Sequence, residues 1–267
     1  MNRPAATLDS AGNLPDSERP ETELAMHPFT LPEDAVRRSI ANRGSAHVFA
    51  GLDPARTALV VVDMQNYFVA PGYMGEVPMA RRVVPAINRL AGAVRQAGGR
   101  VVWIQTSARG ADRSWSVLHR HLMTRERSER RLATMDDGDR GFALWPEMDA
   151  RPGDDGVVKT RYSAFLQGSS PIEARLRGWG ADTVLVAGTA TNVCCESSAR
   201  DAMMLDFKVA MVSDACAAGS DAAHAAALLG FYAFFGDVLT TDEAIAGLGG
   251  ETRAPAEPHP AAARIPG

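Results

Sequence analysis

The sequence predicts a three-layer α/β/α fold built on a six-stranded, mostly parallel sheet. Short runs rich in Val, Ile and Leu are apolar without interruption, as strands buried on both faces must be. These runs alternate with longer segments of helical periodicity, which is the pattern of strand–helix–strand units in a parallel sheet. A length of 267 residues with 46% hydrophobic residues suits one α/β domain with a large core.

Each predicted strand is a short apolar stretch bounded by polar residues or glycine. The clearest is the β-branched run at 58–62, which has the composition of a central strand. The predicted strands, in chain order, are 58–62, 100–105, 156–159, 182–187, 208–213 and 237–240.

The segments between the strands carry helix signals. Apolar residues recur at helical spacing across 84–97, with Pro85 in the predicted first turn and Gly98 closing the helix. The polar segment 106–153 is the longest insertion, and we expect it to form a wall of any pocket. The other predicted helices are 34–44, 114–132, 171–177, 193–206 and 220–235.

Two tails flank the predicted α/β domain, which spans 46–250. The N-terminal tail, 1–45, is rich in Pro, Ala, Ser, Asp and Glu and carries only a short helix that ends at Gly44. The C-terminal tail, 251–267, is rich in Pro and Ala. Residues 1–30 have little apolar surface to bury, so we expect them to be mobile.

Charge and cysteine content exclude several functional classes. A net charge of −4 and a pI of about 5.9 predict no basic surface for nucleic acid, and the dense charge run at 125–131 is interpreted as a solvated helical face. No apolar run reaches the ~18 residues of a membrane span, and the N-terminus lacks a secretory signal. We therefore expect a cytoplasmic protein without membrane partners. The three cysteines, Cys194, Cys195 and Cys216, do not form a disulfide framework.

Three chemically active side chains follow three predicted strands. Asp63 comes directly after the first strand, Lys159 ends the third, and Cys194 lies just past the fourth. Each has a simple alternative: a capping carboxylate, a lysine that reaches solvent, and a buried thiol packed as a small apolar group. Because ligands bind at the carboxyl ends of parallel strands, we expect the three to form one site of nucleophile, acid–base group and cation.

The turn before Cys194 has the composition of a strand-to-helix connection, Gly188-Thr-Ala-Thr-Asn-Val-Cys194. Cys194 is predicted to lie in the first turn of the following helix, where the free backbone N–H groups and the helix dipole favour a thiolate. Cys195 points about 100° away around the helix, so it does not face the same pocket. Cys195 and Cys216 are interpreted as packed thiols.

These motifs resemble the signatures of isochorismatase-like cysteine hydrolases. The resemblance covers about residues 53–245 and is carried by the segments VVDMQN at 61–66, VK at 158–159, GTATNVC at 188–194 and SARD at 198–201. Within that superfamily, the ureidoacrylate amidohydrolases are most similar. They share the segments KTRYS at 159–163, TATNVCCES at 189–197 and FFGDV at 234–238.

The resemblance implies a role for each site residue. Asp63 is the implied general base, Lys159 the group that orients it, and Cys194 the nucleophile. The backbone N–H groups of Ala190 and Cys194 form the implied oxyanion hole, after a cis peptide between Thr189 and Ala190. The resemblance also implies a homo-oligomer, a dimer or tetramer, that acts on a small-molecule amide or ureido substrate.

The substrate-binding residues are less closely defined. Phe68, Gln105 and Tyr162 are expected to line the pocket, although core packing explains Phe68 nearly as well. The stretch that begins at Gln105 differs from the Asn and Trp of ureidoacrylate hydrolases, which leaves the exact substrate open. No cofactor or metal is expected, because His119 and His121 have a spacing that does not share one helix face.

The favoured function is a cysteine-dependent amidohydrolase that cleaves a C–N bond of a small ureido, carbamoyl or amide compound through a thioester. A ureidoacrylate-like substrate is preferred. One alternative is hydrolysis of another small amide, such as an N-carbamoyl compound or biuret. A second is a non-catalytic, thiol-sensing member of the family. A nucleotide-binding module is disfavoured, because neither GxGxxG nor GxxxxGK[ST] follows the first strand.

Overall fold

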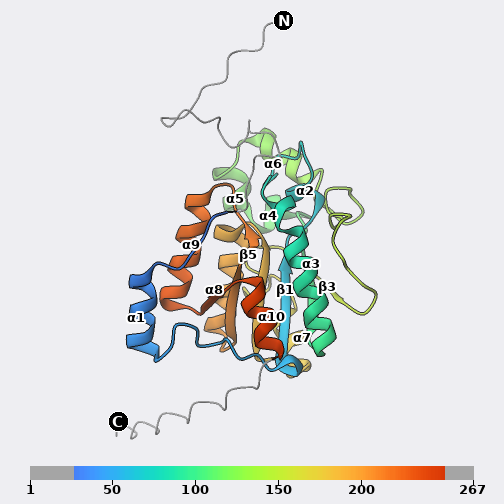
Figure 1. The fold of residues 1–267 in the computed structure, drawn as a ribbon. Helices are drawn as coiled ribbons and strands as arrows, with labels where there is room; N and C mark the ends of the chain where they lie inside the picture. The colour runs from blue at the N-terminus through green and yellow to red at the C-terminus, as the bar shows by residue number, and fades with distance from the viewer. Residues whose placement is uncertain (1–26, 250–267) are drawn as a thin grey trace, which may run out of the picture.

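A computed structural model describes residues 27–249, and its core is a six-stranded sheet in which every strand pair is parallel (Figure 1). The sheet order is β3-β2-β1-β4-β5-β6. This architecture confirms the predicted fold class. The strands are β1 Thr57–Val62, β2 Arg100–Thr106, β3 Asp155–Lys159, β4 Thr183–Thr189, β5 Lys208–Ala217 and β6 Asp237–Leu239. Most of the predicted N-terminal tail and the whole C-terminal tail at 251–267 lie outside the described residues.

The strand order reverses its direction of growth between β1 and β4. From β1 the sheet grows through β2 to β3 on one side, and through β4 to β6 on the other. The connections after β1 and β4 therefore leave the sheet in different directions, and the carboxyl ends of such strands are where open α/β sheets bind ligands. Asp63 directly follows β1, and Cys194 lies in the turn after β4.

β1 forms the centre of the sheet because every residue in it is apolar or small enough to be buried. Its six residues are all buried, and it pairs with β2 on one side and β4 on the other. Alternate side chains enter different layers: Leu59 and Val61 join one hydrophobic core, and Val60 and Val62 join the other. A strand buried on both faces leaves no polar side for solvent.

Helices cover both faces of the sheet (Figure 1). α3 (Ala80–Ala97) and α10 (Thr241–Gly249) pack on one face. α7 (Ile172–Gly178), α8 (Glu196–Met204) and α9 (Asp221–Phe234) pack on the other. Full burial of each large apolar side chain contributes about 1.5–3 kcal/mol. The buried apolar stripe of α3 recurs at helical spacing: Val83, Val84, Ile87, Leu90, Ala91 and Val94.

α3 begins earlier than its apolar pattern predicts. It starts at Ala80, so Pro85 lies inside the helix and not in its first turn, and that prediction was wrong. Proline lacks an N–H, so one main-chain hydrogen bond of the helix is missing at this point. The end of α3 is as predicted, at Gly98 with a φ of 93° that favours glycine.

The N-terminal helix α1 (Glu33–Arg43) packs on α9 and ends at Gly44. Arg43 donates hydrogen bonds to the carbonyls of Ala233 and Gly236, which lie at the end of α9. The hydroxyl of Tyr232 donates to the carbonyl of Ala46 at 2.7 Å. These contacts attach the segment before β1 to the outer helical layer.

The insertion between β2 and β3 covers the carboxyl end of the sheet together with α2 (Asn66–Val69) (Figure 1). The single helix predicted at 114–132 is wrong. Trp115 has φ −134° and ψ 52°, which interrupts the helix, and the Thr124 hydroxyl caps a new one by accepting from Arg127 N. The three short helices are α4 Ala111–Ser114, α5 Ser116–His121 and α6 Arg125–Leu132. We call α2 and α4–α6 the cap.

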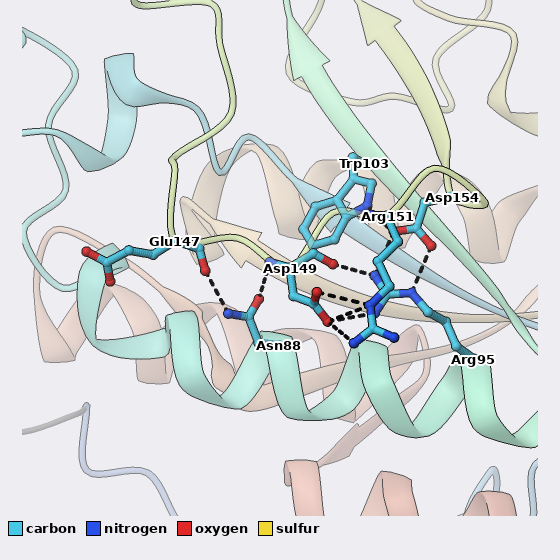
Figure 2. Close-up of polar contacts among 7 residues, drawn as sticks. All are labelled: Asn88, Arg95, Trp103, Glu147, Asp149, Arg151 and Asp154. Carbon is cyan, nitrogen blue, oxygen red and sulfur yellow. Dashed lines mark hydrogen bonds and ion pairs between the residues drawn. The ribbon is translucent and has the colours of Figure 1, made fainter.

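Side chains of α3 hold the last part of the insertion, as Figure 2 shows. The Asn88 amide donates to the carbonyl of Glu147 at 2.8 Å and accepts from the N–H of Asp149 at 2.9 Å. These two hydrogen bonds hold the backbone of Glu147 and Asp149 against α3.

Among residues 27–249, no helix combines the length and apolar character that crossing a membrane requires.

A buried carboxylate anchors the same segment just before β3 (Figure 2). Asp154 accepts from both Nε and Nη2 of Arg95 at 2.8 and 2.6 Å, and from the indole N–H of Trp103 at 2.8 Å. Its side chain is 5% exposed. The pKa of Asp154 is lowered, because these hydrogen bonds outweigh the opposing effect of burial. The network fixes where β3 begins and so where Lys159 lies at its other end.

We expect Asp154→Asn to lower the free energy of unfolding by about 2–3 kcal/mol, because it leaves the half-buried Arg95 without its closest anion. Urea denaturation measures the change. Glu129→Gln is the matched control: Glu129 pairs with Arg125 on the surface, where the two side chains are 62% and 92% exposed, so its loss should stay below about 0.5 kcal/mol. Equal effects in the two variants would contradict the anchoring role of Asp154.

Candidate active site

Asp63 leaves β1 in a conformation that turns its carboxylate into the sheet edge. Its φ is 55°, in the left-handed region that Asp tolerates better than most residues, and its N–H still bonds to Ile104 O at 2.9 Å. The side chain is fully buried. Oδ1 accepts from the hydroxyl of Thr106 at 2.8 Å, and Oδ2 accepts from Nζ of Lys159 at 2.8 Å.

Lys159 is fully buried, so it does not reach solvent. Besides Asp63, its ammonium donates to Oγ1 of Thr106 at 2.5 Å and to the carbonyl of Arg161 at 3.1 Å. Burial by itself lowers the pKa of Lys159, but the negative charge of Asp63 and contact with Cys194 outweigh it, so the pKa is raised. Lys159 is therefore an ammonium that donates to the Asp63 side chain.

Thr106 joins the two charged groups, and the sequence patterns did not identify it. It ends β2 and lies between the strand ends that carry Asp63 and Lys159. Gln65 fixes its backbone: the Gln65 amide accepts from Thr106 N at 2.7 Å and donates to Thr106 O at 3.1 Å. Sequence position could have suggested Thr106 as a site residue, because it directly follows a predicted strand. Gln65 could have been suggested in the same way, because it lies two residues after Asp63.

Cys194 is brought to this edge by the turn after β4. Gly188 has a φ of 113° and approaches β1 so closely that a Cβ there would lie 2.1 Å from Val62 O. The peptide bond between Thr189 and Ala190 is cis. The chain then makes a π-helical turn, Thr191–Cys195, before α8 begins at Glu196. Cys194 therefore lies in the first turn of this helical segment, as predicted, although that turn is π-helical and precedes the regular α-helix.

The thiol of Cys194 is neutral in this setting. Burial raises the pKa of Cys194 to about 12, and the charge of Asp63 together with hydrogen bonding to it also raises the pKa, against the lowering effects of Lys159 and Arg131. The expectation that the turn favours a thiolate is therefore wrong for the resting site. The residue is 5% exposed, and desolvation of the thiolate outweighs the nearby positive charges.

The other two cysteines are packed thiols. The Cys195 thiol donates to Ala187 O at 3.9 Å and the Cys216 thiol to Val186 O at 3.5 Å, both on β4. All three cysteines are buried and free. Cys194 differs in that it interacts with the buried Lys159.

A buried histidine supports the nucleophile-bearing turn. Nδ1 of His224, on α9, lies 2.9 Å from the hydroxyl of Thr191 in the π-helical turn. The ring of His27 stacks on that of His224 with centroids 4.5 Å apart. Burial and the charge of His27 lower the pKa of His224 to about 4, so it is neutral near pH 7. Sequence patterns did not identify either histidine, because they lie far apart in the chain.

Residues 57–243 match the family model of the isochorismatase domain. The match includes the strand ends that carry Asp63, Lys159 and Cys194, and it covers well over half of the sequence. The chain belongs to the isochorismatase family. The resemblance of the sequence motifs to that family is thereby confirmed.

Relatives of this isochorismatase-family hydrolase are named enzymes. The ureidoacrylate amidohydrolase RutB of Methylobacterium radiotolerans is 33% identical over 219 residues, which cover 77% of this chain and 84% of the relative. A cysteine hydrolase from Pseudomonas syringae pv. phaseolicola has a similar structure, with a TM-score of 0.66, 29% identity and coverage of 74% of this chain and 94% of the other. N-carbamoylsarcosine amidase from Thermoplasma acidophilum aligns with a TM-score of 0.56 and 27% identity over 70% of this chain and 97% of the other.

The three predicted lining residues have different environments. Phe68 packs edge-on against Tyr67, with centroids 5.0 Å apart, within the hydrophobic cluster of the cap. The Gln105 amide donates to the carbonyl of Phe142 at 2.9 Å. Tyr162 is 36% exposed, and burial and the charge of a Cys194 thiolate raise its pKa. Tyr162 is thus close enough to Cys194 to share its electrostatic field.

No group of three His, Cys, Asp or Glu side chains within residues 27–249 is arranged to hold a metal ion. His119 lies on α5 with its Nδ1 2.8 Å from the hydroxyl of Ser128. The donors at this edge of the sheet are instead one carboxylate, one ammonium and one thiol. These groups can relay a proton and form a covalent bond to carbon.

We expect iodoacetamide to alkylate Cys194 slowly at about pH 7, with a rate that rises about tenfold per pH unit up to about pH 10, because only the thiolate reacts. Mass spectrometry of the Cys194 peptide measures the rate. The same peptide in the urea-unfolded chain is the control and should level off above about pH 9, since an ordinary thiol has a pKa near 8.5. A folded-state rate that levels off near pH 7 would reveal a resting thiolate and contradict this description.

Proposed function

We propose that this hydrolase is a cysteine amidohydrolase that cleaves a C–N bond of a small ureido or carbamoyl compound, with a ureidoacrylate-like substrate favoured. One observation carries the proposal. The side chain of Asp63, held by Lys159 and Thr106, is buried next to the buried Cys194 thiol, and Lys159 interacts with both Asp63 and Cys194. A base, a cation and a nucleophile are the parts that acyl transfer needs.

The first step moves a proton from sulfur to carboxylate. Asp63 accepts the proton of the Cys194 thiol as Sγ attacks the carbonyl carbon of the substrate, so the thiolate does not accumulate. Lys159 remains charged and stabilises the negative charge that passes from Asp63 to the substrate oxygen. The backbone N–H groups of Ala190 and Cys194 are the proposed oxyanion hole, and one such donor is worth about 3–4 kcal/mol in comparable enzymes.

The second step breaks the C–N bond. Protonated Asp63 gives its proton to the leaving nitrogen, and the acyl group stays on Cys194 as a thioester. Asp63 then deprotonates a water molecule that attacks the thioester carbonyl, and the released thiolate recovers a proton. From a ureido compound, the carbamate that is formed decays to ammonia and carbon dioxide.

The names of two relatives support a carbamoyl substrate. Ureidoacrylate and N-carbamoylsarcosine both carry a carbamoyl group on nitrogen, and both are substrates in the names of proteins related to this chain. The amide of Gln105 is already bonded to Phe142 O in the insertion between β2 and β3, so the substrate contacts of this enzyme are expected to differ from those of its relatives. Biuret and other small amides remain alternatives that need the same three residues.

A thiol sensor is the alternative from another functional class. Sensor thiols are accessible and have low pKa values, since oxidation follows the thiolate. Here burial raises the pKa of both Cys194 and Cys195. A sensor also has no use for a buried ammonium and carboxylate beside the sulfur, so these observations favour catalysis.

Ammonia release from a panel of ureido, carbamoyl and amide compounds tests the proposal. We expect release from at least one ureido acid, and a loss of about 1,000-fold or more in Cys194→Ala, because no covalent bond can form. Cys195→Ala is the matched control and should stay near wild type, since its thiol bonds to Ala187. Equal losses in the two variants would contradict the assignment of the nucleophile.

The hydroxyl of Thr106 provides a finer test. Thr106→Val keeps the shape of the side chain but removes a donor to Asp63 and an acceptor of Lys159, so we expect kcat to fall about 10- to 100-fold. Thr106→Ser keeps the hydroxyl and should retain most of the rate. Ammonia release under saturating substrate measures both. A Thr106→Val enzyme as fast as wild type would remove Thr106 from the proton-handling unit.

A further inference from the structure

Arg131 is a buried cation without an ionic partner. It lies near the end of α6 and is 6% exposed. Its Nε is buried with no hydrogen-bond partner, and its guanidinium forms no ion pair or hydrogen bond with any residue in the described part of the chain. Its one specific contact is with the ring of Tyr67, whose centroid lies 5.6 Å from Cζ. A desolvated guanidinium is unfavourable unless an anion or other acceptor joins it.

Backbone contacts tie the end of α6 to the active-site edge. The carbonyl of Met135, one turn after Arg131, accepts from the N–H of Ala108 at 2.8 Å. The preceding residue, Ser107, donates its N–H to the carbonyl of Lys159 at 3.0 Å. The segment just after Arg131 is therefore hydrogen-bonded to the residues that follow β2, and these are hydrogen-bonded to the end of β3.

Two further observations place Arg131 near the active site. Its contact residue Tyr67 belongs to α2, which begins three residues after Asp63. The charge of Arg131 also opposes the rise in the pKa of both Cys194 and Tyr162. Lys159 is already paired with Asp63, so its charge is compensated inside the protein. Arg131, which has no ion-pair partner among residues 27–249, therefore adds a positive charge that acts on the reacting sulfur.

His119 contributes a second unpaired polar atom next to Arg131. Its Nδ1 lies 2.8 Å from the Ser128 hydroxyl, and its Nε2 is buried without a partner. Burial and the charge of Arg131 lower the pKa of His119, so the ring is neutral at pH 7. Asp112 opposes this effect weakly. If the Ser128 hydroxyl donates to Nδ1, then Nε2 carries the ring proton and is a donor.

We propose that Arg131, with the His119 N–H beside it, binds a carboxylate of the substrate, and that the enzyme therefore acts on ureido or carbamoyl acids and rejects neutral amides. The inference rests on the proposed function for the hydrolytic step and adds the class of substrate. The guanidinium fork matches the two oxygens of a carboxylate. A substrate without an anion leaves Arg131 buried and unpaired, which is how polar sites reject analogues.

Binding of a matched pair of compounds tests this inference. The acid 3-ureidopropionate and its methyl ester are titrated calorimetrically into the Cys194→Ala chain, alone and with Arg131→Met or Arg130→Met added. We expect the acid to bind about 100-fold more tightly than the ester, and Arg131→Met to remove that advantage without changing ester affinity. Arg130 is the exposed neighbour on the same helix, so Arg130→Met should change neither affinity.

Three results would overturn the inference: an acid that binds no more tightly than its ester, an Arg131→Met variant that binds the acid like its parent, or equal losses for acid and ester. The melting temperature without ligand separates binding from folding. Arg131→Met should melt at or above the parent, because it removes an unpaired buried charge. A failure of the proposed function differs from a failure of this inference. If the proposed function is wrong, the wild-type chain releases no ammonia although it still binds the acid more tightly than the ester.

Discussion

Two opposite charges lie fully buried at the carboxyl edge of the sheet, with Nζ of Lys159 2.8 Å from Oδ2 of Asp63. Removing a carboxylate and an ammonium from water is unfavourable, and their attraction compensates only when the remaining donors and acceptors are also satisfied. Thr106 bonds to both groups, and the carbonyl of Arg161 takes a further ammonium proton. The end of β2 and the residues just after β3 supply these partners, so the ends of β1, β2 and β3 must hold fixed relative positions.

The strand order explains how four distant segments meet there. β3, β2, β1 and β4 are consecutive neighbours, and they deliver Lys159, Thr106, Asp63 and the turn to Cys194 respectively. Because all strands are parallel, these four ends point to one side. Burial at this edge raises the pKa of the Cys194 thiol and makes a nearby carboxylate base necessary. Sheet topology thus sets the composition of the site, and burial sets its protonation.

The sequence was sufficient for the strands and for Asp63, Lys159 and Cys194, because buried strands have a local apolar signature and parallel strands share a carboxyl edge. It was insufficient where the outcome depends on packing between distant segments. The thiol is neutral because packing between distant segments buries it, which no local pattern records. Arg131 belongs to a charge run interpreted as a solvated face, yet α6 turns this side chain inward over Tyr67. A break at Trp115 depends on backbone angles that apolar periodicity does not contain.

In the proposed mechanism the buried pair makes Cys194 a nucleophile, and rapid-quench mass spectrometry during turnover tests this role most directly. We expect an adduct with the mass of the substrate's acyl group on the Cys194 peptide within the first turnover. The adduct should be absent from Asp63→Asn, which lacks the base, although that chain still binds substrate. Continued hydrolysis with no adduct on Cys194, or the same adduct formed at the wild-type rate in Asp63→Asn, would contradict the account.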